Sequence, residues 1–375
     1  MEQDDPSMAA RQPDAIDGGG RRAATAGRAA VDLSIVLCTY NGARWLTPML
    51  QSISMQTRPP DEVVVQDDAS SDDTTEVVRE WARSCPFPVS IEVNDTTLGS
   101  TTNFETALRR CRGRSIALAD QDDVWYPEKL ARLSAELDDD PTLTLVFSDA
   151  DLIDEAGEPI DGRLWGNRLI SRALRHHSVV PQRLFARRAV TTGCTMMVRR
   201  RAVTAALPFP EELTAEEAPM RHDRWLSMVA AAVGAAWALP EPLLSFRVHP
   251  SQETGVLSPG ELTRRLGGNA AAVLRGEGSD HSAHLRGRAR QLRVAADRAD
   301  LVGDFQGART LRAVADGLDR RAALGEPEHA SLRALVASFR AGDHDWDLLG
   351  VGAAVSDVVR VIRAPAARRI PAAST

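Results

Sequence analysis

Residues 115–123 read SIALADQDD, an apolar run that ends in three carboxylates within four residues. A run of this length that stops abruptly in acid is typical of a buried β-strand whose carboxyl end opens into a cleft. Carboxylates at such a place repel one another unless a cation lies between them, and all-oxygen ligands suit Mg²⁺ or Mn²⁺. The stretch therefore predicts a divalent-metal site at a sheet edge, and such an ion in turn suggests a bound diphosphate.

The same stretch also fits a simpler interpretation, an Asp-rich turn before a helix. Val124–Lys129 contains a proline and is expected to begin a helix, and solvated acids are common before helices. A second acidic strand end favours the ligand site, because residues 62–70 (EVVVQDDAS) repeat the construction. Two parallel strands that carry acids to one edge have the geometry of a ligand crevice. An EF-hand loop does not fit, since Trp125 stands where that loop needs glycine.

The composition is that of a globular enzyme. Of the 375 residues 43% are hydrophobic, and the net charge is −7, which gives no reason to expect nucleic acid as a partner. The four cysteines (38, 85, 111 and 194) show neither metal spacing nor disulfide clustering, so we expect small core side chains in a reducing compartment. Lys129 is the sole lysine among 45 basic residues, and we interpret the arginine richness as a genomic bias.

The ends of the chain carry weaker signals. Residues 1–30 lack the apolar core of a secretory signal and are expected to be disordered. The longest nearly apolar stretch, Met228–Pro240, is too short to cross a bilayer and is expected to be a buried helix that runs into a strand. We therefore expect a cytoplasmic protein. Residues 358–370 carry arginines without acids, and this tail would either rest on the inner membrane face or form a solvated helix end.

From residue 31 onward, strand and helix patterns alternate. The predicted strands are 33–39, 62–67, 89–93 and the run ending at 119, with helices over 45–56, 72–84 and 100–111. This alternation predicts an α/β fold with a mostly parallel sheet and helices on both faces. A Rossmann dinucleotide site is not expected, because the first turn, Thr39–Gly42, lacks the required glycine spacing.

The predicted sheet domain covers residues 31–257, and residues 258–375 have the composition of a helical C-terminal appendage. Alanine, arginine and leucine recur there at helical spacing. Two antiparallel helices are predicted, interrupted near Gly303–Gly307 and ended around Gly325–Pro327.

Several motifs, in order, resemble the family 2 glycosyltransferases of GT-A fold. The resemblance covers residue 33 to about residue 255, through LSIVLCTYNG (33–42), LQSISMQT (50–57), VQDDASSDDT (65–74) and DQDD (120–123). Within this family, the motif sequences most resemble those of rhamnosyltransferase-like enzymes of cell-surface polysaccharide synthesis. The motifs are GSTTNFE (99–105), DQDDVW (120–125) and RVH (247–249).

This resemblance implies an inverting, metal-dependent transferase. It would move a sugar, with rhamnose as one candidate, from a dTDP- or UDP-sugar to a hydroxyl group of a glycan, a lipid-linked acceptor or a small molecule. Two alternatives are a sugar-1-phosphate nucleotidylyltransferase and a non-catalytic nucleotide-sugar-binding protein. The first is disfavoured, because its glycine-rich N-terminal loop with a following lysine is absent here.

The resemblance also assigns roles to individual residues. Asp122 would bind Mg²⁺ or Mn²⁺, with Asp123 supporting or sharing the ion and His249 returning to it. Inverting transfer needs a general base, and the resemblance gives this role to Asp223, at the start of a predicted helix. The residues that it places around the nucleotide are Thr39, Tyr40, Asn41, Asp68 and, at the ribose, Asp120.

For each of these residues a structural role is the alternative. Asp223 would complement a helix dipole, with His222 as the next candidate base. Asp68 would form a turn and helix cap, and Asp67 has the same pattern. His249 would be an ordinary surface histidine.

Overall fold

The computed structural model describes residues 31–166, 174, 178–252, 281–324, 326, 329, 331–343, 357, 358 and 361. The expectations for residues 1–30 and for the domain boundary at 257 lie outside these residues. So does nearly all of the arginine-rich tail. No helix among the described residues is long and apolar enough to cross a membrane.

The first part of the chain forms four parallel strands joined by helices, as predicted. Each strand position matches the sequence-based range, and the helices begin and end within two residues of it. β1 is buried along its whole length, as expected for a parallel strand covered on both faces. The elements are β1 (Leu33–Thr39), α1 (Ala43–Ser54), β2 (Glu62–Asp67), α2 (Thr74–Ser84), β3 (Val89–Val93), α3 (Ser100–Arg110) and β4 (Ser115–Asp120).

The second part of the chain adds strands of both directions to the same sheet. Their order is β3-β2-β1-β4-β9-β6-β10-β5, with β7 paired to β6 and β8 to β10. β9 is antiparallel to both neighbours, whereas β6 and β10 run with β1–β4. The described sheet is therefore mixed: the expected parallel arrangement holds for β1–β4 and for β6 with β10, whereas β5, β7, β8 and β9 pair antiparallel with their neighbours. The strands are β5 (Val124–Trp125), β6 (Leu143–Ile153), β7 (Pro159–Arg163), β8 (Ser178–Val179), β9 (Met196–Arg199) and β10 (Ala235–Arg247).

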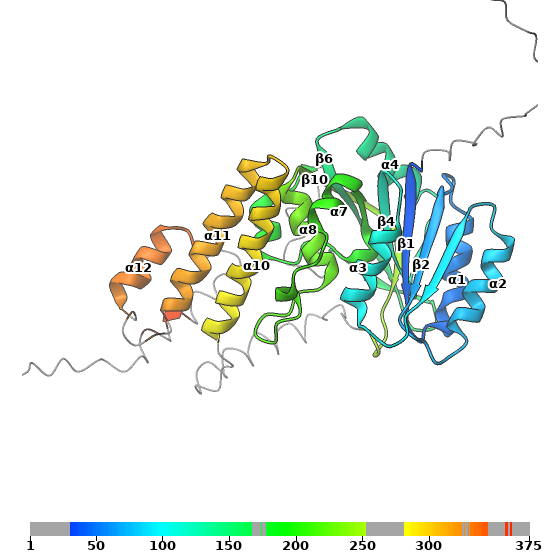
Figure 1. Ribbon diagram of the computed structural model, residues 1–375, viewed down its shortest axis with the longest axis horizontal. Coiled ribbons are helices and arrows are strands. Elements are labelled where there is room, and N and C mark those ends of the chain that lie inside the picture. Colours follow the sequence, from blue (N-terminus) through cyan, green and yellow to red (C-terminus); the bar gives the residue numbers. More distant parts are fainter. Residues whose placement is uncertain are drawn as a thin grey trace, which may run out of the picture. The chain divides into compact units, whose positions relative to one another are not determined.

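Helices cover both faces of the sheet, which confirms the predicted layers. In Figure 1, α1 and α2 lie on one side of β1 and β2, and α3 and α8 lie on the other. The predicted buried helix that runs into a strand is α8 followed by β10. The remaining helical elements of this part are α4 (Lys129–Asp139), α6 (Gln182–Arg187), η1 (Gly193–Thr195), α7 (Arg200–Ala206), η2 (Glu211–Leu213) and α8 (His222–Ala232).

The expectation that Val124–Lys129 begins a helix is wrong. Val124 and Trp125 form β5, which pairs antiparallel with β10, and α4 begins only at Lys129. The amide of Tyr126 donates to the carbonyl of Leu243 at 3.0 Å. Pairing with β10 thus satisfies the backbone here and buries Trp125, so tertiary contacts override the local helix-start pattern.

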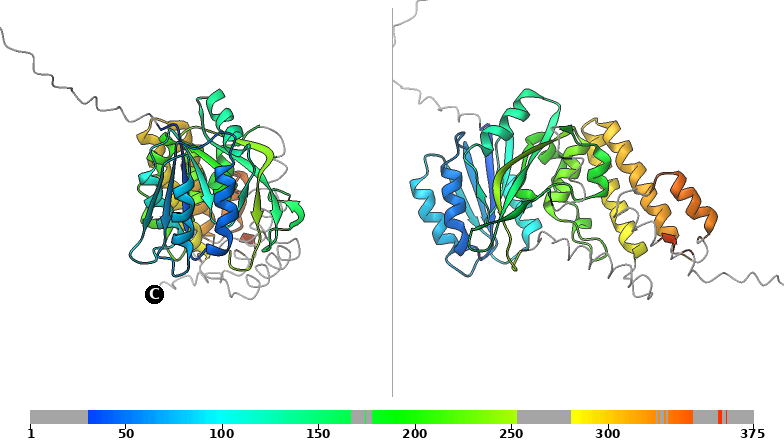
Figure 2. Two further views of the ribbon diagram at one scale, coloured as in Figure 1. Left: turned by 90° about the vertical axis from the view of Figure 1, so that its right-hand side faces the viewer. Right: turned by 180° about the vertical axis from the view of Figure 1, so that it is seen from behind.

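The C-terminal helices form an antiparallel hairpin followed by a third helix. α10 (His281–Leu301) and α11 (Phe305–Ala323) lie side by side in Figures 1 and 2, and both contact α8. The break near residue 303 is as predicted, but Gly307 lies inside α11. α12 (Leu332–Arg340) was not predicted. The appendage is therefore packed directly against a helix of the sheet domain.

Candidate active site

The acidic loop, residues 120–123, leaves the carboxyl end of β4 and returns as β5. Arg247, at the end of β10, holds it in two places. Its Nε donates to the carbonyl of Asp122 at 2.7 Å, and its backbone N donates to Oδ1 of Asp123 at 3.0 Å. Arg247 is buried, so these bonds are shielded from water. The conformation of the loop is thus fixed by a residue far away in the sequence.

Gln121 ties the same loop to the turn after β1. Its Oε1 accepts from the amide of Tyr40 at 2.8 Å, and its Nε2 donates to the carbonyl of Tyr40 at 2.9 Å. Gly42 makes room for this side chain, because a Cβ there would lie 2.1 Å from Oε1. The loop and the first turn are therefore held together by this side chain.

Asp122 and His249 form a pair at this edge of the sheet. Oδ2 of Asp122 lies 3.0 Å from Nε2 of His249, and the imidazole stacks on Trp45 with ring centroids 4.1 Å apart. Metal–oxygen bonds of about 2.1 Å in an octahedral site put neighbouring ligand atoms about 3 Å apart. The spacing of this pair therefore fits two adjacent ligands of a divalent ion.

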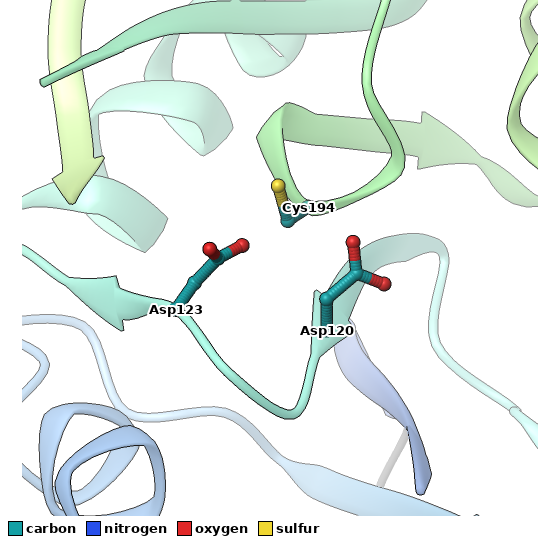
Figure 3. Close-up of side chains that lie close together, drawn as sticks. All are labelled: Asp120, Asp123 and Cys194. Atoms are coloured by element: carbon teal, nitrogen blue, oxygen red, sulfur yellow. The ribbon is translucent and has the colours of Figure 1, made fainter. Parts of the chain in front are cut away.

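A second group of ligand atoms lies beneath the loop. One atom each from Asp120, Asp123 and Cys194 falls within 4.8 Å of the others, and Figure 3 shows the three side chains close together. Burial raises the pKa of the Cys194 thiol well above its usual range, so the thiol stays protonated. A neutral thiol is a poor ligand for Mg²⁺ or Mn²⁺. Of the two groups, the Asp122–His249 pair has the better chemistry for these ions.

Burial and mutual repulsion raise the pKa of two of the three acids of the loop. Burial, followed by the charge of Asp122, raises the pKa of Asp120 to about 7. Burial and the same neighbour also raise the pKa of Asp123. Asp123 is 0% exposed, and its Oδ2 has no hydrogen-bond partner among the described residues. A cation near the loop would lower the free energy of all three carboxylates.

Asp223 lies across from this loop, in the first turn of α8. Its Oδ1 accepts from the amide of Arg224 at 2.7 Å, and Nε of Arg221 lies 3.9 Å from the same oxygen. The charge of Asp223 contributes to the raised pKa of Asp120, so the two carboxylates are close enough to interact electrostatically. The side chain is 13% exposed and remains reachable by a ligand.

His222, the neighbouring residue, has a different environment. It is buried, and its ring stacks on Phe104 with centroids 3.8 Å apart. Burial lowers the pKa of His222 to about 4, and neither ring nitrogen has a hydrogen-bond partner among the described residues. The geometry favours Asp223 over His222 as the residue that meets a substrate.

The ends of β1 and β2 complete the edge. Oγ1 of Thr39 donates to Asp67 at 2.6 Å, so Asp67 organises the first turn. Asp68 instead accepts from the amides of Leu98 and Gly99, both at 2.8 Å, and holds the start of α3. Its role toward a nucleobase stays a prediction.

The first turn itself presents Tyr40 and Asn41 outward. Tyr40 is exposed, and Asn41 has φ 45°, a left-handed conformation that asparagine tolerates. Oδ1 of Asn41 accepts from the amide of Ser71 at 2.8 Å, which ties the turns after β1 and β2 together. In the sheet register, Thr39 pairs with Asp67, and Cys38 pairs with Asp120. The predicted residues of β1, β2 and β4 therefore lie side by side.

Comparison with known proteins gives a family match. Residues 34–205 match the family described as Glycosyl transferase family 2. This part of the chain is thus similar to glycosyltransferase family 2. Its sheet carries the acidic loop at the carboxyl end of β4.

Curated relatives and solved structures match parts of the chain. Rv1520 of Mycobacterium tuberculosis is 30% identical over 223 residues, which are 58% of this chain and 59% of Rv1520. WfgD of Escherichia coli, a UDP-Glc:alpha-D-GlcNAc-diphosphoundecaprenol beta-1,3-glucosyltransferase, is 34% identical over 98 residues, 26% of this chain and 38% of WfgD. The crystal structure of S. aureus TarS 1–349 in complex with UDP aligns with a TM-score of 0.49 at 18% identity, covering 88% of this chain and 89% of that chain. The chain thus spans about 59% of the length of the Rv1520 relative.

Some residues that shape this site were not singled out from the sequence. Gln121 carried a signal, since an amide inside an acidic loop needs a partner. Arg247 was noted only as part of a motif, and its contacts depend on the approach of β10 to the loop. The Gly193–Thr195 turn, which lies against both Asp123 and Asp223, carried no signal in the sequence.

Proposed function

We propose that this chain is an inverting glycosyltransferase that moves a sugar from a nucleotide-sugar donor to a hydroxyl acceptor. One observation carries the proposal: the Asp122–His249 pair and Asp223 lie at the same sheet edge as the ends of β1 and β2. The Asp122–His249 pair suits a metal ion that binds a diphosphate leaving group. Asp223 suits an acceptor hydroxyl that must lose a proton.

The proposed metal ligands are Asp122 and His249, with Asp123 in support. A Mg²⁺ or Mn²⁺ ion there would act as a Lewis acid on the leaving diphosphate. Trp45 supports this role, because its stacked ring holds the imidazole with Nε2 toward Asp122. Asp120, on the strand beside β1, is the proposed ribose contact.

Asp223 is the proposed base. Its Oδ1 is taken up by the amide of Arg224, and its Oδ2 has no hydrogen-bond partner among the described residues. That oxygen is therefore open to the acceptor hydroxyl. It would take the proton while the acceptor oxygen attacks the anomeric carbon and the diphosphate leaves, a single displacement that inverts the centre.

A pyrimidine nucleotide, UDP or dTDP, is the proposed donor carrier. Among the described residues, Oδ2 of Asp68 accepts one hydrogen bond, from the amide of Gly99, which leaves a lone pair for a nucleobase N–H. The printed name of WfgD, which includes UDP-Glc and a diphosphoundecaprenol-linked sugar, supports a UDP-type donor and a lipid-linked acceptor. Rhamnose as the transferred sugar rests on the motif resemblance alone.

Thermal unfolding with UDP, dTDP, GDP and ADP, each with Mn²⁺ and with chelator, tests this function. A ligand that binds only the folded state raises its stability by mass action. We expect stabilisation by UDP or dTDP that requires Mn²⁺ and is lost in Asp122→Asn. Asp139→Asn is the matched control, since Asp139 is an exposed acid at the end of α4.

Two results would contradict the proposal. One is equal stabilisation by ADP and UDP, and the other is an unchanged response to Mn²⁺ in Asp122→Asn. Where a UDP- or dTDP-sugar is turned over, the anomeric configuration of the product by NMR decides between inversion and retention.

A further inference from the structure

Lys129 is the only lysine of this protein, since 44 of the 45 basic residues are arginine. The chain uses arginine at every other basic position, exposed or buried. Lysine and arginine are not interchangeable at a buried site, because the guanidinium is larger and planar. The position is the first residue of α4, directly after the acidic loop and β5.

The ammonium group of Lys129 lies inside the protein. The side chain is 0% exposed, and Nζ lies 3.6 Å from the ring centroid of Trp125. Nζ donates a hydrogen bond to the backbone carbonyl of Cys194. No carboxylate of the described residues lies within ion-pair distance, so the carbonyl is the direct partner of Nζ. A buried polar group is unfavourable without such a hydrogen bond, which makes the contact specific.

Cys194 is the middle residue of the short η1 turn, Gly193–Thr195. On one side of this turn, Cys194 lies beside Asp120 and Asp123 of the acidic loop, with one ligand atom of each residue within 4.8 Å of the others (Figure 3). On the other side, Gly193 lies against α8. A Cβ on Gly193 would be 3.3 Å from Nε2 of His222 and 3.5 Å from Cβ of Asp223. One turn therefore touches both the acidic loop and the residue that carries the proposed base.

We propose that Lys129 is a positioning residue that fixes the distance between the acidic loop and Asp223. By holding the Cys194 carbonyl, it keeps the Gly193–Thr195 turn in place as a spacer between them. This inference rests on the proposed function, in which the loop serves the leaving group and Asp223 serves the acceptor. The two groups act on one reacting carbon, so their separation sets the rate. A displacement of about 1 Å can lower a rate about 10²-fold.

Lys129→Met tests the proposal, because methionine keeps the length of the side chain and removes the donor. We expect kcat to fall about 10–10²-fold, with the Kd of UDP in the presence of Mn²⁺ within about threefold of wild type and KM for the donor little changed. Lys129→Arg should not restore kcat. Arg132→Met is the matched control, since Arg132 lies one turn along α4 and pairs with Glu241 on the surface.

Gly193→Ala adds a methyl group on the side of the Gly193–Thr195 turn that contacts α8, and it leaves Lys129 unchanged. We expect it to lower kcat and spare UDP binding in the same way, so the proposal stays testable if Lys129→Met does not fold. A purely structural role for Lys129 predicts something else: lower thermal stability with wild-type kcat per folded molecule. Wild-type kcat in both Lys129→Met and Gly193→Ala would overturn the proposal.

Hydrogen–deuterium exchange separates this inference from the proposed function, because it needs no turnover. In Lys129→Met, amides of residues 193–195 and 120–123 should exchange at least about tenfold faster than in wild type, while those of β1–β3 stay unchanged. Arg132→Met should show no such change. If wild type neither binds UDP nor turns over a UDP- or dTDP-sugar, the proposed function fails, and the exchange pattern still decides on the spacer.

Discussion

Two adjacent aspartates of the acidic loop have opposite environments. Asp123 turns inward, where the amide of Arg247 donates to it, whereas Asp122 turns toward His249. The same carboxylate chemistry thus serves to hold the loop at one position and to offer a ligand atom at the next. The backbone conformation of the loop, fixed by Gln121 and Arg247, decides which residue does which.

Asp223→Asn tests the base at the scale of one atom. Asparagine keeps an oxygen for the amide of Arg224 but cannot take a proton from the acceptor. We expect kcat to fall by about 10²–10⁴-fold with the Kd of the donor nearly unchanged. Steady-state kinetics with saturating acceptor, alongside donor binding by calorimetry, measures both. A variant that keeps wild-type kcat would assign Asp223 to capping of α8.

His222 predicts an acid-side loss of stability. Burial lowers the pKa of the folded residue to about 4, against about 6.5 in the unfolded chain. Between these values the unfolded chain binds a proton that the folded protein does not. The contribution of neutral His222 to the free energy of unfolding is therefore complete above pH 6.5. It is lost as the pH falls toward 4, by at most about 1.4 kcal/mol per pH unit.

Urea unfolding at pH 7, 6 and 5 measures this slope. His222→Phe can stack on Phe104 without titrating. Its free energy of unfolding should change less with pH, by an amount that corresponds to up to one proton taken up on unfolding. The control is His329→Gln, because His329 is exposed. Equal slopes in His222→Phe and wild type would mean that His222 does not titrate differently in the folded and unfolded states.

At the scale of elements, the sequence predicts those whose pattern is local. β1 and β4 are continuous apolar runs, and such a run is enough to predict a strand that is buried on both faces. β5 is different, because two residues are too few to show a hydrophobic pattern. They form a strand only because β10 lies next to them. β9 lies antiparallel between β4 and β6, an arrangement that no alternation of strand and helix indicates. α12 was missed because it follows α11 after a break of eight residues that resembles the end of the fold.

The same contrast holds for the site. Asp122, Asp223 and Asp68 follow strands or begin a helix, so a motif finds them. Arg247, Gly193 and Lys129 act through backbone groups of residues far along the chain, or through the space they leave. Their contacts exist only after the sheet has formed, and a single sequence does not encode which carbonyl a side chain will reach.

Gly307 sets how closely α11 approaches α8. A Cβ at this position would lie 1.9 Å from the carbonyl oxygen of Ala232, the last residue of α8. We expect Gly307→Ala to lower the free energy of unfolding by about 1–3 kcal/mol, because two backbones must separate. Gly303→Asn is the control, since Gly303 has φ +84° with no atom within 4 Å, and asparagine tolerates that conformation. Urea unfolding of both variants gives the comparison, and an unchanged Gly307→Ala protein would contradict this packing.

At the scale of the whole molecule, the C-terminal helices are continuous with the core of the sheet domain. Leu285, Leu292 and Leu311 belong to the same buried cluster as Leu226 and Val229 of α8. The helix that carries Asp223 at its first turn is therefore covered by the appendage. Stability of the hairpin and rigidity of the proposed base are linked through α8.

Truncation after residue 252 is expected to expose this face of α8. Loss of several buried leucines should lower the free energy of unfolding by more than about 3 kcal/mol, and an apolar dye such as ANS should bind the shortened protein. Urea unfolding followed by tryptophan fluorescence, with the full chain beside it, measures the effect. A shortened protein that unfolds at the same urea concentration and binds no dye would show that the helices add no stability.

The burial of the single lysine gives the chain an unusual response to proteolysis. A protease that cuts only after lysine has one target in this sequence, the bond between Lys129 and Leu130, and both residues are fully buried. The native fold hides that bond, so cleavage requires an opening of the central sheet and releases two fragments, residues 1–129 and 130–375. When reclosing is faster than cutting, the rate of appearance of these fragments follows the population of the open form. The protein thereby carries its own unfolding reporter, and any nucleotide or metal that stabilises the native state should slow that one cut.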